Sequence, residues 1–156
     1  MWHEFIEGFG LACTFGSPAT PEEVDNLEAD VDLHLPLELR ELLLEANGIA
    51  VKPRFSGEPV PSALAAEEGW QFSLIWSVTE ITEQIFLFRS WDDAVPPPGL
   101  IPFGSQPNGD LVALRSSNNE ERSCEIISID HEDWRSCQVI AASLHESLTV
   151  LLEAYQ

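Results

Sequence analysis

The sequence is poor in basic residues, and this scarcity excludes several classes of partner. It holds 7 Lys and Arg residues against 27 Asp and Glu residues, and Lys52 is its sole lysine, so the formal net charge is −20 at pH 7. Proteins that bind nucleic acids present a basic footprint to the phosphates, and anionic membrane surfaces attract clusters of Lys and Arg. We therefore expect neither a nucleic-acid partner nor a membrane partner.

Cysteines and long apolar runs are also scarce. Three cysteines (Cys13, Cys124 and Cys137) are an odd number without metal-ligand spacing, which favours a reducing cytoplasm over a disulfide framework. Glu4 and Glu7 stand where a secretory signal would be basic and then apolar. No apolar run approaches the roughly 20 residues that a membrane span requires. These features predict a soluble, cytoplasmic protein.

What the sequence does have is enough apolar material for a core. At 156 residues and 44% hydrophobic content, it predicts one domain over residues 1–156 rather than a disordered acidic chain. The acidic residues are spread over both halves, which indicates an acidic globule and not an acidic tail. Such a charge either maintains solubility or speeds the encounter with a basic partner.

Capping motifs and helical spacing dominate the first third of the chain. Apolar residues recur at helical spacing over residues 1–9. The run Thr20-Pro21-Glu22-Glu23 is a capping box with proline at the first helical position, so a second helix should begin there. A third should begin at Leu35-Pro36 and end at Asn47-Gly48, with Gly48 as a left-handed cap. The last two helices predict an αα-hairpin, and the Pro- and Gly-rich stretch 52–69 predicts a loop.

The rest of the chain carries mainly strand patterns and ends in a helix. The turn dipeptide Asn108-Gly109 should join two of the strands as a hairpin. The whole predicts an α+β fold: a single domain with a mostly antiparallel sheet, helices packed on one side, an N-terminal αα-hairpin and a C-terminal helix. The expected strands are 70–76, 100–103, 111–114 and 124–129, and the expected helices are 78–91, capped by Thr79, and 143–154.

The densest polar cluster is Asp130-His131-Glu132-Asp133, directly after a predicted strand. Neighbouring side chains on an extended chain point to opposite faces, and no established metal-binding spacing is present, so we favour a turn that exposes acids and that His131 fixes by hydrogen bonds. Asp110 should either bond turn amides or face a partner. The sequence has no G-x-S-x-G motif and no cysteine in a nucleophile context. We therefore expect no catalytic residue, no cofactor and no metal. A metal-dependent hydrolase that uses Asp130, His131 and Asp133 stays open as an alternative.

Tryptophan is frequent for a chain of this length, with five residues. Trp2, Trp70 and Trp76 fit a core, whereas Trp91 and Trp134 stand beside charged residues. Aromatic side chains in such settings are typical anchors of protein interfaces, although packing at a domain edge explains them equally well.

The order of these motifs resembles the SUKH superfamily. The resemblance spans nearly the whole chain in the family's order, with a first helix bearing "PATxEE…LE", then "LP", then a helix ending in "NG". The residues that carry it are Pro18–Glu23, Leu27-Glu28, Leu35-Pro36, Leu42-Leu43, Asn47-Gly48, Leu74–Trp76, Ile101–Gly104, Asn108–Asp110, Ile129–Glu132 and Ala142–Leu144. Gln84, where close relatives often have Asn, and the Pro- and Ala-rich stretch 52–69 depart from the pattern.

The resemblance implies a single SUKH-like domain, with residues 1–18 as an N-terminal helix and lead-in and residues 19–156 as the core module. Bacterial members of this superfamily are regarded mostly as immunity proteins that neutralise polymorphic or contact-dependent toxins, many of them nucleases, and no catalytic activity is implied. The predicted partner is therefore a basic protein toxin. The alternative is a regulatory interaction module of the cell-wall assembly regulator type, without a toxin. The predicted partner-binding residues are Trp76, Trp91, Asp92, Asp93, Asp110, Asp130, Glu132, Asp133 and Trp134.

Overall fold

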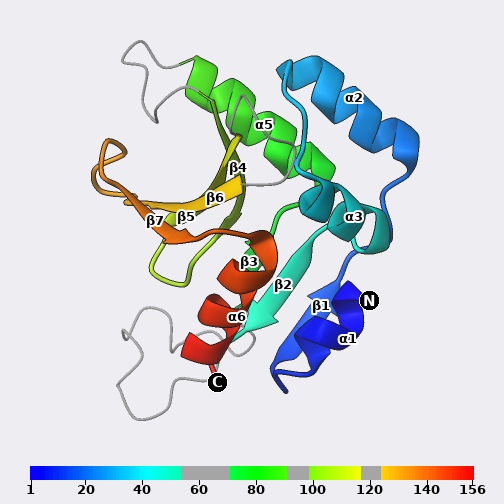
Figure 1. Cartoon of the computed structure of the whole chain (residues 1–156), viewed down its shortest axis with the longest axis vertical. Helices are drawn as coiled ribbons and strands as arrows, with labels where there is room; N and C mark the ends of the chain where they lie inside the picture. The colour runs from blue at the N-terminus through cyan, green and yellow to red at the C-terminus, as the bar shows by residue number, and fades with distance from the viewer. Residues whose placement is uncertain (54–70, 91–98, 117–123) are drawn as a thin grey trace.

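The computed structural model describes residues 1–53, 71–90, 99–116 and 124–156 (Figure 1). Three features of the sequence analysis lie outside these residues: the part of the predicted loop beyond Pro53, the residue Trp70, and the run that begins with Trp91, Asp92 and Asp93. The described elements are, in order, α1 (Trp2–Glu7), β1 (Ala12–Phe15), α2 (Pro21–Val31), α3 (Leu37–Glu45), β2 (Ile49–Lys52), β3 (Phe72–Ile75), α5 (Val78–Arg89), β4 (Leu100–Ser105), β5 (Leu111–Ser116), β6 (Cys124–Ile129), β7 (Cys137–Ala141) and α6 (Leu144–Ala154).

Two helices begin with complete capping boxes. At α2 the Glu23 amide donates to Thr20 Oγ1 at 3.2 Å and the Thr20 amide donates to the Glu23 carboxylate at 2.7 Å, which confirms the predicted cap. The predicted helix from Val78 is also confirmed, but its cap is Ser77 and not Thr79. Ser77 stands three residues before Glu80, and this spacing gives the reciprocal pair of hydrogen bonds.

The predicted glycine cap of α3 is wrong. The helix ends at Glu45, and Ala46 takes an extended conformation because the chain turns at once toward β2. Gly48 does have a left-handed conformation, with φ of 100°, but it lies in that connection. The left-handed cap belongs instead to α2, at Asp32.

The strands form two antiparallel sheets where the sequence predicted one. The first has the order β1-β2-β3 and the second has the order β4-β5-β6-β7. Prediction from sequence located strands at β3, β4, β5 and β6 and missed the short strands β1, β2 and β7. The α+β class, the antiparallel pairing and the N-terminal and C-terminal helices are confirmed.

The two sheets meet where β3 approaches β4. The Trp76 amide donates to the Phe103 carbonyl at 2.7 Å, and Ser105 Oγ donates to the Ser73 carbonyl at 3.1 Å. At Gly104, a Cβ atom would lie 2.0 Å from the Leu74 carbonyl oxygen. The glycine is therefore required for this close approach of the two backbones.

The helices pack against these sheets and bury one continuous apolar cluster. In Figure 1, α2 lies beside α5 and α1 lies beside β1, whereas α6 follows β7 and packs against β6 and β7. The cluster includes fully buried side chains from both sheets and from the five helices α1, α2, α3, α5 and α6, among them Ile6, Leu27, Leu42, Leu74, Ile81, Phe103, Leu114 and Leu148. Within the described part of the chain, no helix is both long and apolar enough to cross a membrane.

Candidate functional site

The turn between β4 and β5 is held by its own backbone and by two side chains. The Gln106 amide donates to the Asp110 carbonyl at 2.8 Å, and the Asp110 amide donates to Asn108 Oδ1 at 3.1 Å. Gly109 has φ of 94°, a conformation that glycine adopts without strain. The predicted Asn-Gly turn is confirmed, and it presents the Asp110 carboxylate at the end of the hairpin.

The turn between β6 and β7 is built on Asp130. Its Oδ1 atom accepts hydrogen bonds from the amides of Glu132 at 2.8 Å and Asp133 at 3.2 Å. The Ser136 amide closes the turn by donating to the Asp133 carbonyl at 2.7 Å. The side chains of Glu132 and Asp133 are exposed, so this segment is the acid-exposing turn that the sequence predicted.

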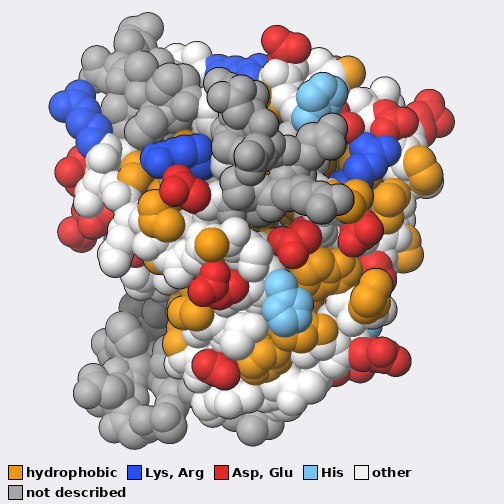
Figure 2. All heavy atoms as spheres, in the orientation of Figure 1, with side chains coloured by type: hydrophobic (Ala, Val, Ile, Leu, Met, Phe, Trp, Pro, Cys, Tyr) orange, Lys and Arg blue, Asp and Glu red, His pale blue; other side chains and the backbone are white. Residues whose placement is uncertain are grey.

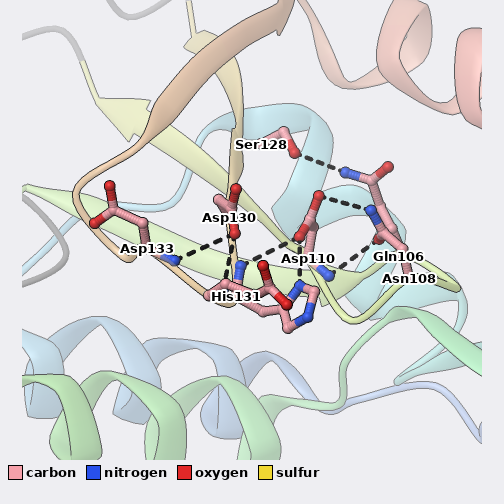
Figure 3. A network of polar contacts seen from close by, with 8 residues as sticks. Gln106, Asn108, Asp110, Ser128, Asp130, His131 and Asp133 are labelled. Atoms are coloured by element: carbon pink, nitrogen blue, oxygen red, sulfur yellow. Dashed lines mark hydrogen bonds and ion pairs between the residues drawn. The ribbon is translucent and has the colours of Figure 1, made fainter.

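The two turns are joined by Asp110 and His131, which are 21 residues apart (Figure 3). Asp110 Oδ1 accepts from the His131 amide at 3.2 Å and lies 2.8 Å from His131 Nδ1. Behind them, Gln106 Nε2 donates to Ser128 Oγ at 2.8 Å. No local pattern in the sequence signals this pairing, because it depends on the register of β5 with β6, in which Leu111 pairs with Ile129.

Hydrogen bonds shift the pKa values of both Asp110 and His131. Burial raises the pKa of Asp110, but the hydrogen bonds from the His131 side chain and amide and from Asn108, together with the charge of His131, outweigh it and leave the pKa lowered. The pKa of His131 is raised, chiefly by its hydrogen bond to Asp110, with burial opposing and the charges of Asp110, Glu132 and Asp130 adding to the rise. The pair therefore favours an ionised Asp110 and a protonated His131.

The structure brings four of the predicted partner-binding residues together: Asp110, Asp130, Glu132 and Asp133 (Figure 3). Trp134 follows them, partly buried, with its ring 6.0 Å from that of Phe88 on α5. Trp76 is only 8% exposed and belongs to the core, so we remove it from the candidate surface. Trp91, Asp92 and Asp93 lie outside the described residues.

One group with metal-ligating atoms occurs among the described residues, and it lies at this same place. Asp110, Asp130 and His131 each offer a ligand atom, and these atoms lie within 4.8 Å of one another. The set differs from the predicted one, because Asp110 takes the place of Asp133. Asp110 already bonds His131, and Asp130 already bonds two turn amides, so a cation would have to compete with both sets of hydrogen bonds. These hydrogen bonds order the β4–β5 and β6–β7 turns and leave the carboxylates of Glu132 and Asp133 exposed.

The acidic character extends well beyond the two turns. Figure 2 shows carboxylates over the whole visible face, whereas the Lys and Arg side chains on that face lie in its upper half. Two of the bases are already engaged in ion pairs: Arg40 pairs with Asp25 and Glu28, and Arg115 pairs with Glu125. On this face, acidity alone therefore does not single out one patch, and the ordered turns are distinguished by their local geometry.

Comparison with known families identifies the chain. The model of the SMI1 / KNR4 family (SUKH-1) matches residues 18–149. The protein belongs to this family. The match begins just before the Thr20 capping box and includes both turns of the candidate site, so it confirms the superfamily that the motif order indicated. No curated protein matches the chain.

Proposed function

We propose that this SUKH-1 family protein is a non-catalytic binding protein that neutralises a basic protein toxin, of the nuclease class. The observation that carries the proposal is the surface formed by the β4–β5 and β6–β7 turns. There the Asp110–His131 pair and the Asp130 turn hold Glu132 and Asp133 exposed on a chain with a net charge of −20. Ordered carboxylates on an acidic globule match the basic surface that a nuclease offers to phosphates.

The mechanism is steric and electrostatic. The long-range field speeds the encounter of the two proteins, and the carboxylates of the turns then occupy positions that substrate phosphates would take. Trp134, partly buried against Phe88, supplies the apolar contact beside these charges. Such a pairing of an aromatic anchor with peripheral charges is typical of tight interfaces.

Two features support binding over catalysis. The carboxylates that are best placed to act, those of Asp110 and Asp130, already accept hydrogen bonds from loop amides and from His131. A groove of about 210 Å³ lies at the first sheet and is lined by residues that include Thr14, Asn47, Ser73 and Glu80. The candidate carboxylates do not line it.

Co-expression tests the proposal directly. The gene next to that of this protein is expressed with and without it, and survival of the cells is measured; we expect rescue. The informative variant joins Glu132→Gln to Asp133→Asn, and its matched control joins Glu41→Gln to Asp30→Asn, an equal change of charge at exposed helical positions. The first pair should weaken binding more than the second.

Salt dependence isolates the electrostatic part of the mechanism. Affinity measured by calorimetry should fall steadily between about 50 and 500 mM NaCl, because screening weakens exposed charge pairs. Failure of rescue would overturn the toxin hypothesis and leave the regulatory interaction module. Bound metal in the purified protein, together with a hydrolytic activity that Asp130→Asn abolishes, would overturn the non-catalytic assignment.

A further inference from the structure

Among the described residues, no strand pairs with the outer edge of β7. The second sheet has the order β4-β5-β6-β7, so β7 pairs with β6 on one side only. Natural edge strands are commonly protected by charged side chains or proline. Residues Cys137 to Ala141 contain neither, and Val139 is 52% exposed. The register with β6 shifts only beyond Val139, between the partners Val139 and Ala141, so Cys137 to Val139 form a regular edge.

The other sheet edges are differently placed. β1 forms an edge of the first sheet, and α1 packs against it (Figure 1). β3 and β4 approach each other and share the hydrogen bond from the Trp76 amide to the Phe103 carbonyl. Within the described residues, β7 is therefore the edge that offers main-chain donors and acceptors to another chain.

The register identifies which groups point outward. The Asp130 amide donates to the Ser136 carbonyl at 3.1 Å, and the next pairs along the ladder are Ile129 with Cys137 and Ser128 with Gln138. In an antiparallel ladder, hydrogen-bonded and non-hydrogen-bonded pairs alternate. Gln138 therefore faces β6, whereas Cys137 and Val139 direct their amides and carbonyls to the free edge.

The charged residues around the β7 edge indicate the charge of the chain that would bind there. Glu132 and Asp133 lie in the turn that precedes β7, and Glu146 lies in the first turn of the helix that follows it. Among the described residues, the bases near β7 are Arg135 and Arg115, and Arg115 is paired with Glu125, so the three carboxylates of Glu132, Asp133 and Glu146 outnumber the one base without an acidic partner of its own in this set. A second copy of the chain would bring another charge of −20 to the same edge, which disfavours a symmetric β7–β7 pair.

We infer that an extended basic segment of the partner protein adds to the second sheet as a strand along β7, with its Lys or Arg residues facing the carboxylates at the two ends of β7. This inference rests on the proposed function and gives it a binding mode. Main-chain hydrogen bonds supply affinity in such strand addition, and side chains supply selectivity. The partner's strand would lie directly beside the acid-exposing turn, so one interface includes both features.

Val139→Pro tests the inference, because proline removes an outward amide and leaves the bonds to β6 in place. Val139→Ala is the matched control, since it removes side-chain atoms and keeps the amide. With the neighbour-encoded protein as ligand, we expect Val139→Pro to weaken binding about tenfold and Val139→Ala less than about twofold. A thermal melt establishes that both variants remain folded. Equal affinities for Val139→Pro and wild type would overturn the inference while leaving the proposed function intact.

Hydrogen exchange gives a second readout. On binding, the amides of Cys137 and Val139 should exchange at least about tenfold more slowly, and the amide of Gln138 should change little because it already faces β6. Unchanged exchange at Cys137 and Val139 in a saturated complex would overturn the inference.

A peptide probe keeps the test independent of the partner's identity. If the neighbour-encoded protein does not bind, the proposed function fails, and an alternating Lys–Val octapeptide then tests the edge alone, with an alternating Glu–Val octapeptide as control. Binding of the Lys–Val peptide with slowed exchange at Val139 supports the edge assignment, and equal behaviour of the two peptides overturns it. A doubled molecular mass in solution that Val139→Pro abolishes would assign the edge to a second copy and overturn the inference as well.

Discussion

Two carboxylates, Glu45 and Asp110, make similar contacts in two regions of this molecule and serve different purposes. Glu45 on α3 accepts from the N-terminal ammonium at 2.7 Å, from the Trp2 amide at 2.9 Å and from the His3 amide at 2.8 Å. Asp110 accepts from the amide of His131, lies beside the ring of that residue, and accepts from Asn108. The first joins the start of the chain to the helical core, and the second joins two exposed turns to each other.

The comparison shows that the partners of a carboxylate, and not its chemistry, decide what it does. Glu45 fixes α1, which buries Trp2 and Ile6 against the core, so its bonds contribute to folding. Asp110 fixes turns whose neighbouring acids remain exposed, so its bonds shape a surface. The comparison predicts that losing Glu45 costs stability, and that losing Asp110 chiefly costs the order of the binding surface.

Removal of Glu45 should have the larger effect. Glu45→Ala leaves the amides of Trp2 and His3 without their acceptor, and we expect a loss of about 2 kcal/mol in the free energy of unfolding, measured by urea denaturation. Glu41→Ala, at an exposed position of the same helix, is the control and should change stability by less than about 0.5 kcal/mol. Equal losses in the two variants would remove the distinction on which the comparison depends.

The free energy of unfolding at acidic pH should also depend on Glu45. Burial raises the pKa of Glu45, but the hydrogen bonds from His3, the N-terminal ammonium and Trp2 lower it from 4.5 to about 2. A group whose folded pKa is depressed stabilises the protein above its unfolded pKa and loses that contribution as pH falls through the folded value. Unfolding free energies measured between about pH 7 and pH 3 should therefore decline more steeply for the wild type than for Glu45→Gln. Parallel curves would contradict this account.

Loss of Asp110 should have the smallest effect on stability and the clearest local effect. We expect Asp110→Asn to cost about 1 kcal/mol or less, because the side chains of both partners are partly exposed. The pKa of His131, followed by NMR, should lie above 6.5 in the wild type and fall in this variant. The stabilisation from His131 is present below its unfolded pKa and is lost as pH rises through the raised folded value. A His131 titration that is unchanged in Asp110→Asn would show that the pair does not form in solution.

Prediction from sequence succeeded where the signal was local. The Thr20 capping box, the Asn108-Gly109 turn and the apolar periodicity of the C-terminal helix each act within a few residues, so their structures follow from neighbours in the chain. The cap at Ser77 also has a local signal, because Glu80 stands three residues after it. The prediction of Thr79 as the cap did not take this Ser-x-x-Glu spacing into account. The strands β1 and β2 have four residues each and were missed, whereas β3 is equally short but lies within the apolar and aromatic run from Trp70 to Trp76, which the sequence shows clearly.

By itself, the sequence determined the α+β class, the family and the acidity, because periodicity, capping motifs and charge are properties of the chain read in order. Tertiary structure decided the division into two sheets, the burial of Trp76 in the core and the meeting of Asp110 with His131. It also decided that β7, a strand without a period of its own, lies at the edge of its sheet. The physical reason is that strand order and register are set by contacts between residues far apart in sequence, which no local pattern records.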